Sequence, residues 1–125
     1  MILDTNALSA FVAQDAALLR VIRHTPELTL PVIVLGEYRF GISQSRHRAD
    51  YEAWLDRDLN LFSVLSIVEE TTRHYAAIRL ELKRKGLPVP ANDAWIAALA
   101  RQHRLAIVSR DTHFDAVHDL ERIDW

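Results

Sequence analysis

The sequence contains no cysteine among its 125 residues. This absence excludes a disulfide framework and any zinc site built on thiolates. It fits a reducing compartment, and we expect a cytoplasmic protein. The six histidines offer no substitute, because no pair of them has zinc-ligand spacing with a third partner.

Long apolar runs are also missing. No stretch approaches the roughly 20 apolar residues that a membrane-spanning helix needs. The first residues, MILDTN, do not place a basic segment before an apolar run. We therefore expect neither a membrane span nor a secretory signal.

The charge balance is close to even, with a formal net charge of −2. This value does not by itself indicate a nucleic-acid-binding protein. Compact basic runs stand at Arg46–Arg48 and Lys83–Lys85, and they could form a basic rim around an acidic pocket. They could equally be solvated helix faces, since charge patterning alone is weak evidence.

What remains is an ordinary globular composition, with 50% hydrophobic and 26% charged residues. A chain of this length can bury a core without help from metals or disulfides. We find no internal repeat, low-complexity segment or long linker, so residues 1–125 are predicted to form a single domain.

Short apolar segments alternate with stretches of helical periodicity along the whole chain. The predicted strands cover residues 1–3, 28–30, 63–67, 105–109 and a short segment at 122–123. The predicted helices cover residues 7–13, 15–25, 31–43, 47–60, 68–85 and 92–103. This alternation predicts an α/β fold, a three-layer α/β/α sandwich with a central parallel sheet of four to five strands.

Acidic residues fall where these elements meet loops. Asp4 follows the first strand and Asp111 follows the fourth, so both should emerge at the carboxyl edge of the sheet, where ligands bind in parallel sheets. Asp93 begins a helix that enters from that side, and Glu37 lies about one turn into another helix. The four acids could therefore converge on one pocket.

Converging carboxylates repel one another unless a cation lies between them. A hard divalent ion such as Mg²⁺ or Mn²⁺ prefers oxygen ligands and would suit such a pocket. It could also bind a phosphodiester oxygen and activate a water molecule. Acids, a metal ion and a basic rim together indicate phosphodiester hydrolysis.

Each acid also has a simpler explanation. Asp4 could cap a helix, and Asp93 could be an acid favoured in the first turn of a helix. Asp111 could be a turn residue, and Glu37 could face solvent. The observation that favours a shared site is that all four positions map to one edge of one sheet.

Three segments and the final residue carry a resemblance to a known family. They are LDTNALS, PVIVLGEYRFGI, PANDAWIAALARQHRLAIVSRDTHF and Trp125, supported by YAAIRLELKRKG between them. In this ordered set the chain resembles PIN-domain ribonucleases, and in particular the VapC toxins of bacterial toxin–antitoxin pairs. The similarity extends over nearly the whole chain.

The resemblance implies the PIN fold and a metal-binding quartet. Its metal-binding and catalytic acids are Asp4, Glu37, Asp93 and Asp111, with Asn6 and Ser109 as supporting polar residues and Asp115 as an additional outer acid. Glu37 would bind the ion or orient the attacking water. Members of the family are Mg²⁺- or Mn²⁺-dependent endoribonucleases that limit translation or growth.

The resemblance also implies partners. These are an RNA substrate, a second copy of the chain in a homodimer, and a VapB-like antitoxin that inhibits the toxin by reaching into the active site. A toxin–antitoxin hetero-oligomer would follow from the last two contacts.

Two other functions compete with this one. An aspartyl-nucleophile phosphatase also has an aspartate after its first strand, but it usually needs a second acid two residues later, where this chain has Asn6. A non-catalytic module that binds RNA or a partner on the same fold is the second. His103 and His113 are assigned structural roles here, Phe114 an anchoring role, and the tryptophans core or interface packing.

Overall fold

Five short parallel strands form the centre of the molecule, in the order β3-β2-β1-β4-β5. The computed structural model describes all residues, 1–125. The strands are β1 (Ile2–Leu3), β2 (Leu28–Pro31), β3 (Phe62–Leu65), β4 (Ile107–Val108) and β5 (Arg122–Ile123). The predicted α/β class and the parallel sheet are confirmed.

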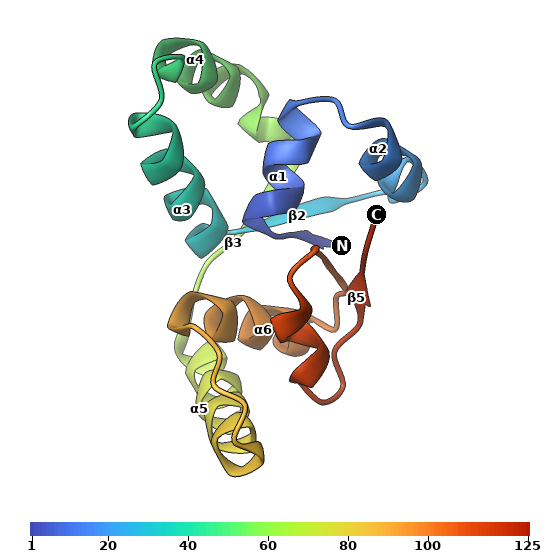
Figure 1. The fold of residues 1–125 in the computed structure, drawn as a ribbon, viewed down its shortest axis with the longest axis vertical. Coiled ribbons are helices and arrows are strands. Elements are labelled where there is room, and N and C mark those ends of the chain that lie inside the picture. The colour runs from blue at the N-terminus through green and yellow to red at the C-terminus, as the bar shows by residue number, and fades with distance from the viewer.

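Helices cover both faces of this sheet (Figure 1). They are α1 (Thr5–Val12), α2 (Ala16–Ile22), α3 (Val32–Ser43), α4 (Arg48–Asp58), α5 (Glu69–Lys85) and α6 (Ala91–His103), with short 3₁₀ segments η1 (Leu59–Leu61) and η2 (Thr112–Ala116). In Figure 1, α1 to α4 lie on one side of the sheet, and α5 and α6 lie on the other. None of these helices is long and apolar enough to span a membrane.

The order of the strands changes direction at the pair β1 and β4. From β1 the chain adds β2 and β3 on one side of β1, and then it adds β4 and β5 on the other side. In open parallel sheets such a switch point opens a crevice beyond the carboxyl ends of the two strands. The topology therefore defines one preferred place for a ligand site.

The sheet is buried from both faces, which explains its continuous apolar strands. Ile2, Leu3, Ile107 and Val108 are fully buried. Full burial of an aliphatic side chain contributes roughly 1.5–3 kcal/mol of hydrophobic stabilisation. The buried ends of β1 and β4 therefore fix the positions of Asp4 and Ser109, the residues that immediately follow them.

Local capping sets several helix boundaries. Asp4 caps α1 by accepting a hydrogen bond from the Thr5 amide, and Asp15 caps α2 by accepting from the Ala17 and Leu18 amides. Gly86 ends α5 as its C-cap, in the left-handed conformation with φ of 66° that glycine adopts readily.

Several predicted boundaries were wrong by a few residues. The helix predicted over 15–25 ends at Ile22, and the strand predicted over 63–67 is Phe62–Leu65. β3 therefore begins at Phe62, one residue before the predicted start. Pro31 ends β2 and precedes α3, because a residue without an N–H can still accept in the pairing with β3.

The fourth strand is also shorter than the predicted 105–109. Arg104 takes a left-handed conformation with φ of 55° at the end of α6, and the amide of Leu105 bonds back to Ala100. This cap uses residues 104 and 105 to end the helix. Regular pairing therefore begins only at Ile107.

Candidate functional site

The predicted acids gather beyond the carboxyl ends of β1 and β4, at the switch point of the sheet, and this place is called the crevice below. These strands pair in register, with Leu3 opposite Val108, so the next residues of both strands leave the sheet side by side. The Asp4 amide donates to the Val108 carbonyl at 3.2 Å. Asp4 and Ser109 are consequently neighbours, although they are far apart in the sequence.

Asp4 is held by three hydrogen bonds. Its Oδ1 accepts from the Thr5 amide at 2.8 Å, and its Oδ2 accepts from the Ser109 hydroxyl at 2.7 Å and from the Asn6 amide group at 3.3 Å. The side chain is almost fully buried. Asp4 therefore caps α1, as the simpler explanation proposed, while it also faces the crevice.

Ser109 and Asn6 join the first strand to the loop that carries Asp111. The Ser109 hydroxyl accepts from the Asp111 amide at 2.9 Å and from the Asn6 amide group at 3.2 Å. The Asn6 carbonyl oxygen accepts from the Arg110 amide at 3.3 Å. Both residues thus contact the acids that they were predicted to support.

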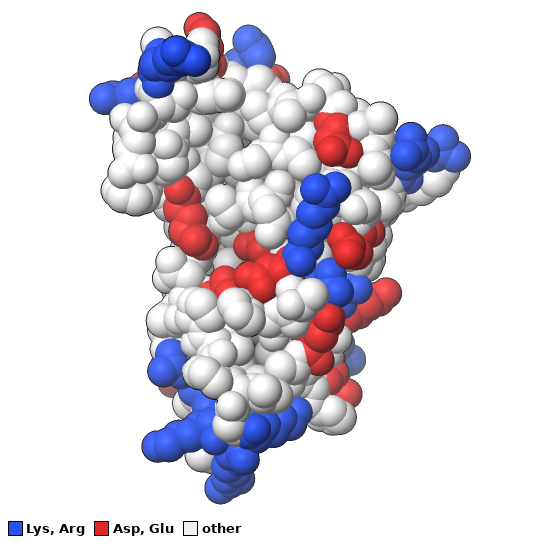
Figure 2. Space-filling model, viewed as in Figure 1, with Lys and Arg blue, Asp and Glu red and all other residues white.

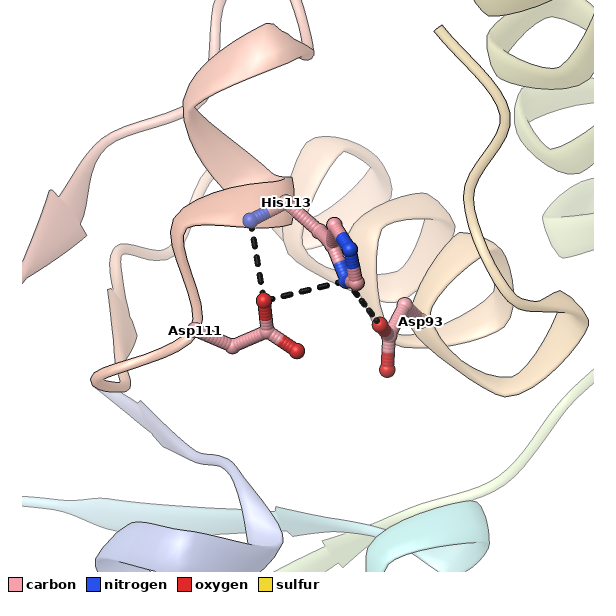
Figure 3. Close-up of side chains that lie close together, drawn as sticks. All are labelled: Asp93, Asp111 and His113. Carbon is pink, nitrogen blue, oxygen red and sulfur yellow. Dashed lines mark hydrogen bonds and ion pairs between the residues drawn. The ribbon is translucent and has the colours of Figure 1, made fainter.

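The second half of the site is a compact group of Asp93, Asp111 and His113 (Figure 3). The His113 Nδ1 lies 3.3 Å from Oδ2 of Asp93 and 3.0 Å from Oδ1 of Asp111. One ligand atom from each of the three residues lies within 4.8 Å of the others. Asp93 comes from the first turn of α6, and the other two come from the start of η2.

Local sequence explains why Asp111 and His113 point into this space. Asp111 caps η2, and its Oδ1 accepts a hydrogen bond from the His113 amide at 2.9 Å. Phe114, the next residue, is fully buried in the core. Because Phe114 packs inward, the loop before it is fixed at the crevice, as its predicted anchoring role requires.

His113 is the site residue that sequence reasoning missed. It was assigned a structural role because no second histidine shared a zinc-ligand spacing with it. Its ring instead lies against carboxylates from two other positions in the chain. The detectable signal was its place two residues after Asp111, in the segment that leads into Phe114.

Glu37 approaches the site from α3. It is not part of the compact group of three. Burial raises its pKa, and the charge of Asp4 raises it further, while a hydrogen bond from Asn92 has the opposite effect. The charge of Asp4 therefore acts on the Glu37 carboxylate. Asn92, the residue before Asp93, is hydrogen-bonded to the same carboxylate.

Burial and, after it, repulsion between carboxylates raise the pKa values of Asp4 and Asp93. Burial raises the pKa of Asp93 to about 6, and the charge of Asp111 adds to the effect. The pKa of Asp4 is also raised, first by burial and then by the charge of Asp111, against the hydrogen bonds from Ser109 and Thr5. The folded protein therefore holds these carboxylates close together at an electrostatic cost.

Asp115 lies outside this group. Its carboxylate pairs with Arg122 at 2.7 and 3.0 Å, and the Arg122 side chain donates to the Ser109 carbonyl at 2.9 Å. The pairing with Arg122 lowers the pKa of Asp115. Its contact with the site thus passes through Arg122 and the backbone of Ser109.

The aromatic residues pack as predicted. Trp54 contacts Phe11 with ring centroids 6.2 Å apart, and Trp95 stacks on Tyr75 at 3.8 Å. Trp125 lies under the Arg110 guanidinium, 4.5 Å from the ring centroid. His103 is exposed at the C-terminal end of α6, the opposite end of that helix from Asp93.

The residues of the crevice fit a divalent metal ion. Four carboxylates offer the oxygen ligands that a hard cation prefers, and a cation bound between them would offset both their burial and their mutual repulsion. The buried hydroxyl of Thr5, next to Asp4, faces the Glu37 carboxylate and lowers its pKa, so α1 and α3 meet at the site.

The surface around the crevice is mixed in charge. Figure 2 shows acidic side chains gathered across the waist of the molecule, with a basic side chain running beside them. Most other Lys and Arg side chains visible on this face lie toward the two ends. On this face the narrow middle of the molecule is therefore acidic, and basic side chains lie around it.

Comparison with known proteins identifies the family. The PIN domain family model matches residues 1–120, so the chain belongs to the PIN-domain family. Ribonuclease VapC4 of Mycobacterium tuberculosis is 33% identical over 104 residues, which cover 78% of this chain and 76% of that protein. The tRNA(fMet)-specific endonuclease VapC of Shigella flexneri is 30% identical over 100 residues, covering 79% of this chain and 76% of that protein.

A solved structure agrees with these relatives. The crystal structure of VapBC-5 from Mycobacterium tuberculosis, a member of the VapBC family of toxin–antitoxin systems, matches with a TM-score of 0.77 and 30% identity, covering 99% of this chain and 97% of that chain. Within the PIN-domain family, this chain is a VapC-type toxin ribonuclease of a toxin–antitoxin pair. The phosphatase alternative is thereby set aside.

Proposed function

We propose that residues 1–125 form a single PIN domain that hydrolyses RNA phosphodiester bonds with Mg²⁺ or Mn²⁺, held by Asp4, Glu37, Asp93 and Asp111. The observation that carries this proposal is the convergence of acids from separate segments: ligand atoms of Asp93, Asp111 and His113 lie within 4.8 Å of one another, and the charge of Asp111 acts on both Asp4 and Asp93. Carboxylates gathered in this way are stabilised by a cation bound between them.

When bound, such an ion would polarise the scissile phosphate and lower the pKa of a bound water. Each residue of the chain then has a distinct part. Asp4, fixed by Ser109 and Asn6, presents its carboxylate from a rigid strand end. Asp93 and Asp111 would supply oxygens from α6 and from the start of η2, and the Glu37 carboxylate would bind the ion or orient the attacking water.

The substrate we propose is structured RNA. Arg110 is exposed beside the site, and the Trp125 ring and main-chain carbonyl hold its guanidinium in place. A guanidinium fixed in this way can hold a phosphate next to the scissile bond and give salt-dependent affinity. The Shigella flexneri relative is named for tRNA(fMet), so tRNA is the first substrate class to test.

We further propose a VapB-like antitoxin as inhibitor, by analogy with the VapBC structure. From the resemblance to VapC toxins we also propose a homodimer as the form of the free toxin. The dimer, together with the antitoxin, would form the hetero-oligomer. A cytoplasmic location follows from the RNA substrate. The competing proposal, a non-catalytic module on the same fold, predicts RNA or partner binding without a cleavage product.

The decisive experiment incubates purified protein with total tRNA, with and without Mg²⁺ or Mn²⁺. We expect cleavage that stops with EDTA and falls by about a hundredfold or more in Asp93→Asn, as for loss of a group that stabilises developing charge. Asp56→Asn is the matched control, because Asp56 is exposed in the last turn of α4. Undiminished cleavage in Asp93→Asn would remove the mechanism, and metal-independent RNA binding without any product would favour the non-catalytic module.

A further inference from the structure

We propose that His113 is a metal ligand, and that its imidazole nitrogen makes the site prefer Mn²⁺ to Mg²⁺. This inference rests on the proposed function, since it concerns the same metal site. It adds a nitrogen donor to the four acids that sequence similarity assigns to the site.

The first argument is distance. In an octahedral site with metal–ligand bonds of about 2.1 Å, two neighbouring ligand atoms lie about 3 Å apart. The His113 Nδ1 is 3.0 Å from the Asp111 Oδ1 and 3.3 Å from the Asp93 Oδ2. Two of the three separations therefore match those of neighbouring ligands around one ion, and the third, between the two carboxylates, is within 4.8 Å.

The second argument is that the ring is positioned from both sides. The His113 amide donates to the Asp111 carboxylate, so backbone and side chain of this residue contact the same acid. Phe114, the residue after His113, is buried in the core and so fixes the backbone next to the ring. Figure 3 shows the ring facing the carboxylates of Asp93 and Asp111 from its own short helix.

The third argument is ligand chemistry. Mg²⁺ takes oxygen ligands and keeps much of its water, whereas imidazole nitrogen suits divalent transition metals. An imidazole at this position would therefore add affinity for Mn²⁺ and contribute little to Mg²⁺ binding. An acid-only site, in contrast, would treat the two ions more alike.

A simpler role for His113 would be to form a hydrogen-bonded ion pair with the two acids. In that case a bound cation would displace the ring, and no nitrogen would bind the ion. The two roles place Nδ1 differently with respect to the metal, and a measurement on the bound metal separates them.

The test uses electron spin-echo envelope modulation of bound Mn²⁺, which detects a directly coordinated ¹⁴N nucleus. The protein is the full chain with any histidine tag removed. We expect ¹⁴N modulation in the wild type and in His103→Ala, whose histidine is exposed at the end of α6. We expect none in His113→Ala or His113→Asp.

Calorimetric titration supplies the second readout. We expect His113→Ala to weaken Mn²⁺ binding by about tenfold, the scale at which changes around metal ligands act, with a smaller effect on Mg²⁺. In His113→Asp an oxygen replaces the nitrogen, so the preference should shift toward Mg²⁺. Circular dichroism confirms that each variant is folded.

The outcomes separate this inference from the proposed function. If Mn²⁺ binds the wild type without ¹⁴N modulation, or if the modulation persists in His113→Ala, the role of His113 is wrong and the metal site stands. If neither ion binds the wild type, the metal site and this inference fail together.

Discussion

The hydroxyl of Ser109 donates a 2.7 Å hydrogen bond to the carboxylate of Asp4, joining residues 105 positions apart in the sequence. Both groups are buried at the point where the neighbouring strands β1 and β4 end. The same hydroxyl accepts from the Asp111 amide. The Ser109 side chain therefore fixes Asp4 and Asp111 relative to each other.

Replacing Ser109 by alanine should weaken metal binding more than it weakens the fold. The change removes a donor to Asp4 and an acceptor for Asp111, so both acids lose orientation. We expect metal affinity to fall by about tenfold, as for loss of an outer partner of a ligand. Calorimetric titration with Mn²⁺ measures this, and Ser9→Ala, at an exposed position of α1, is the control. Equal affinity in the two variants would contradict the role of Ser109.

The metal-free protein should lose stability as the pH rises through the pKa of Asp93. That pKa is raised from 3.8 to about 6 by folding, so the folded state binds more protons than the unfolded state between these values. The stability associated with a neutral Asp93 is therefore complete below about pH 4 and is lost above about pH 6.

It follows that Asp93→Asn should be more stable than the wild type in EDTA at pH 7.5. We expect a gain of roughly 1 kcal/mol, allowing for solvent screening, which shrinks toward zero near pH 4. Urea unfolding at both pH values measures the difference, with Asp56→Asn as control. Added Mn²⁺ should reverse the order by stabilising only the wild type. A variant that is less stable at pH 7.5 would show that Asp93 is not under repulsion.

Asp115 should prove to support the site from outside. Its carboxylate side chain is 53% exposed and contacts the site only through Arg122. We expect Asp115→Asn to cost no more than about 1 kcal/mol of stability, as for a surface ion pair, and to leave Mn²⁺ affinity within about threefold of the wild type. Asp111→Asn should abolish binding in the same titration. A comparable loss in both variants would make Asp115 a ligand.

Phe114→Leu should loosen the loop that carries Asp111 and His113. The matched control is Phe62→Leu, which makes the same change in β3 at the far edge of the sheet. Both should lower the free energy of unfolding by about 1 kcal/mol. Only Phe114→Leu should also weaken Mn²⁺ binding. If both variants bind equally, the anchoring of the loop does not matter for the site.

Periodicity and capping residues were sufficient to predict every major helix and strand. The apolar segments around Ile2 and Ile107 indicated a buried parallel sheet because only strands covered on both faces are continuously apolar. Boundaries were less well predicted. Phe62 fits both a helix stripe and a strand, and the end of α6 depends on Arg104 adopting a left-handed conformation that its residue type does not favour.

The sequence by itself determined the fold class and predicted that Asp4, Glu37, Asp93 and Asp111 meet at one edge of the sheet, while the resemblance to PIN-domain ribonucleases added Asn6 and Ser109 as predicted supporting residues. It could do so because strand ends and helix starts are encoded locally, and parallel strands bring their carboxyl ends to one edge. Only the tertiary structure decided the distances within the crevice. It raised the pKa values of three acids by burying them together, directed Asp115 to Arg122, and placed the His113 ring between Asp93 and Asp111. Those properties depend on contacts between segments far apart in the chain, which no local pattern specifies.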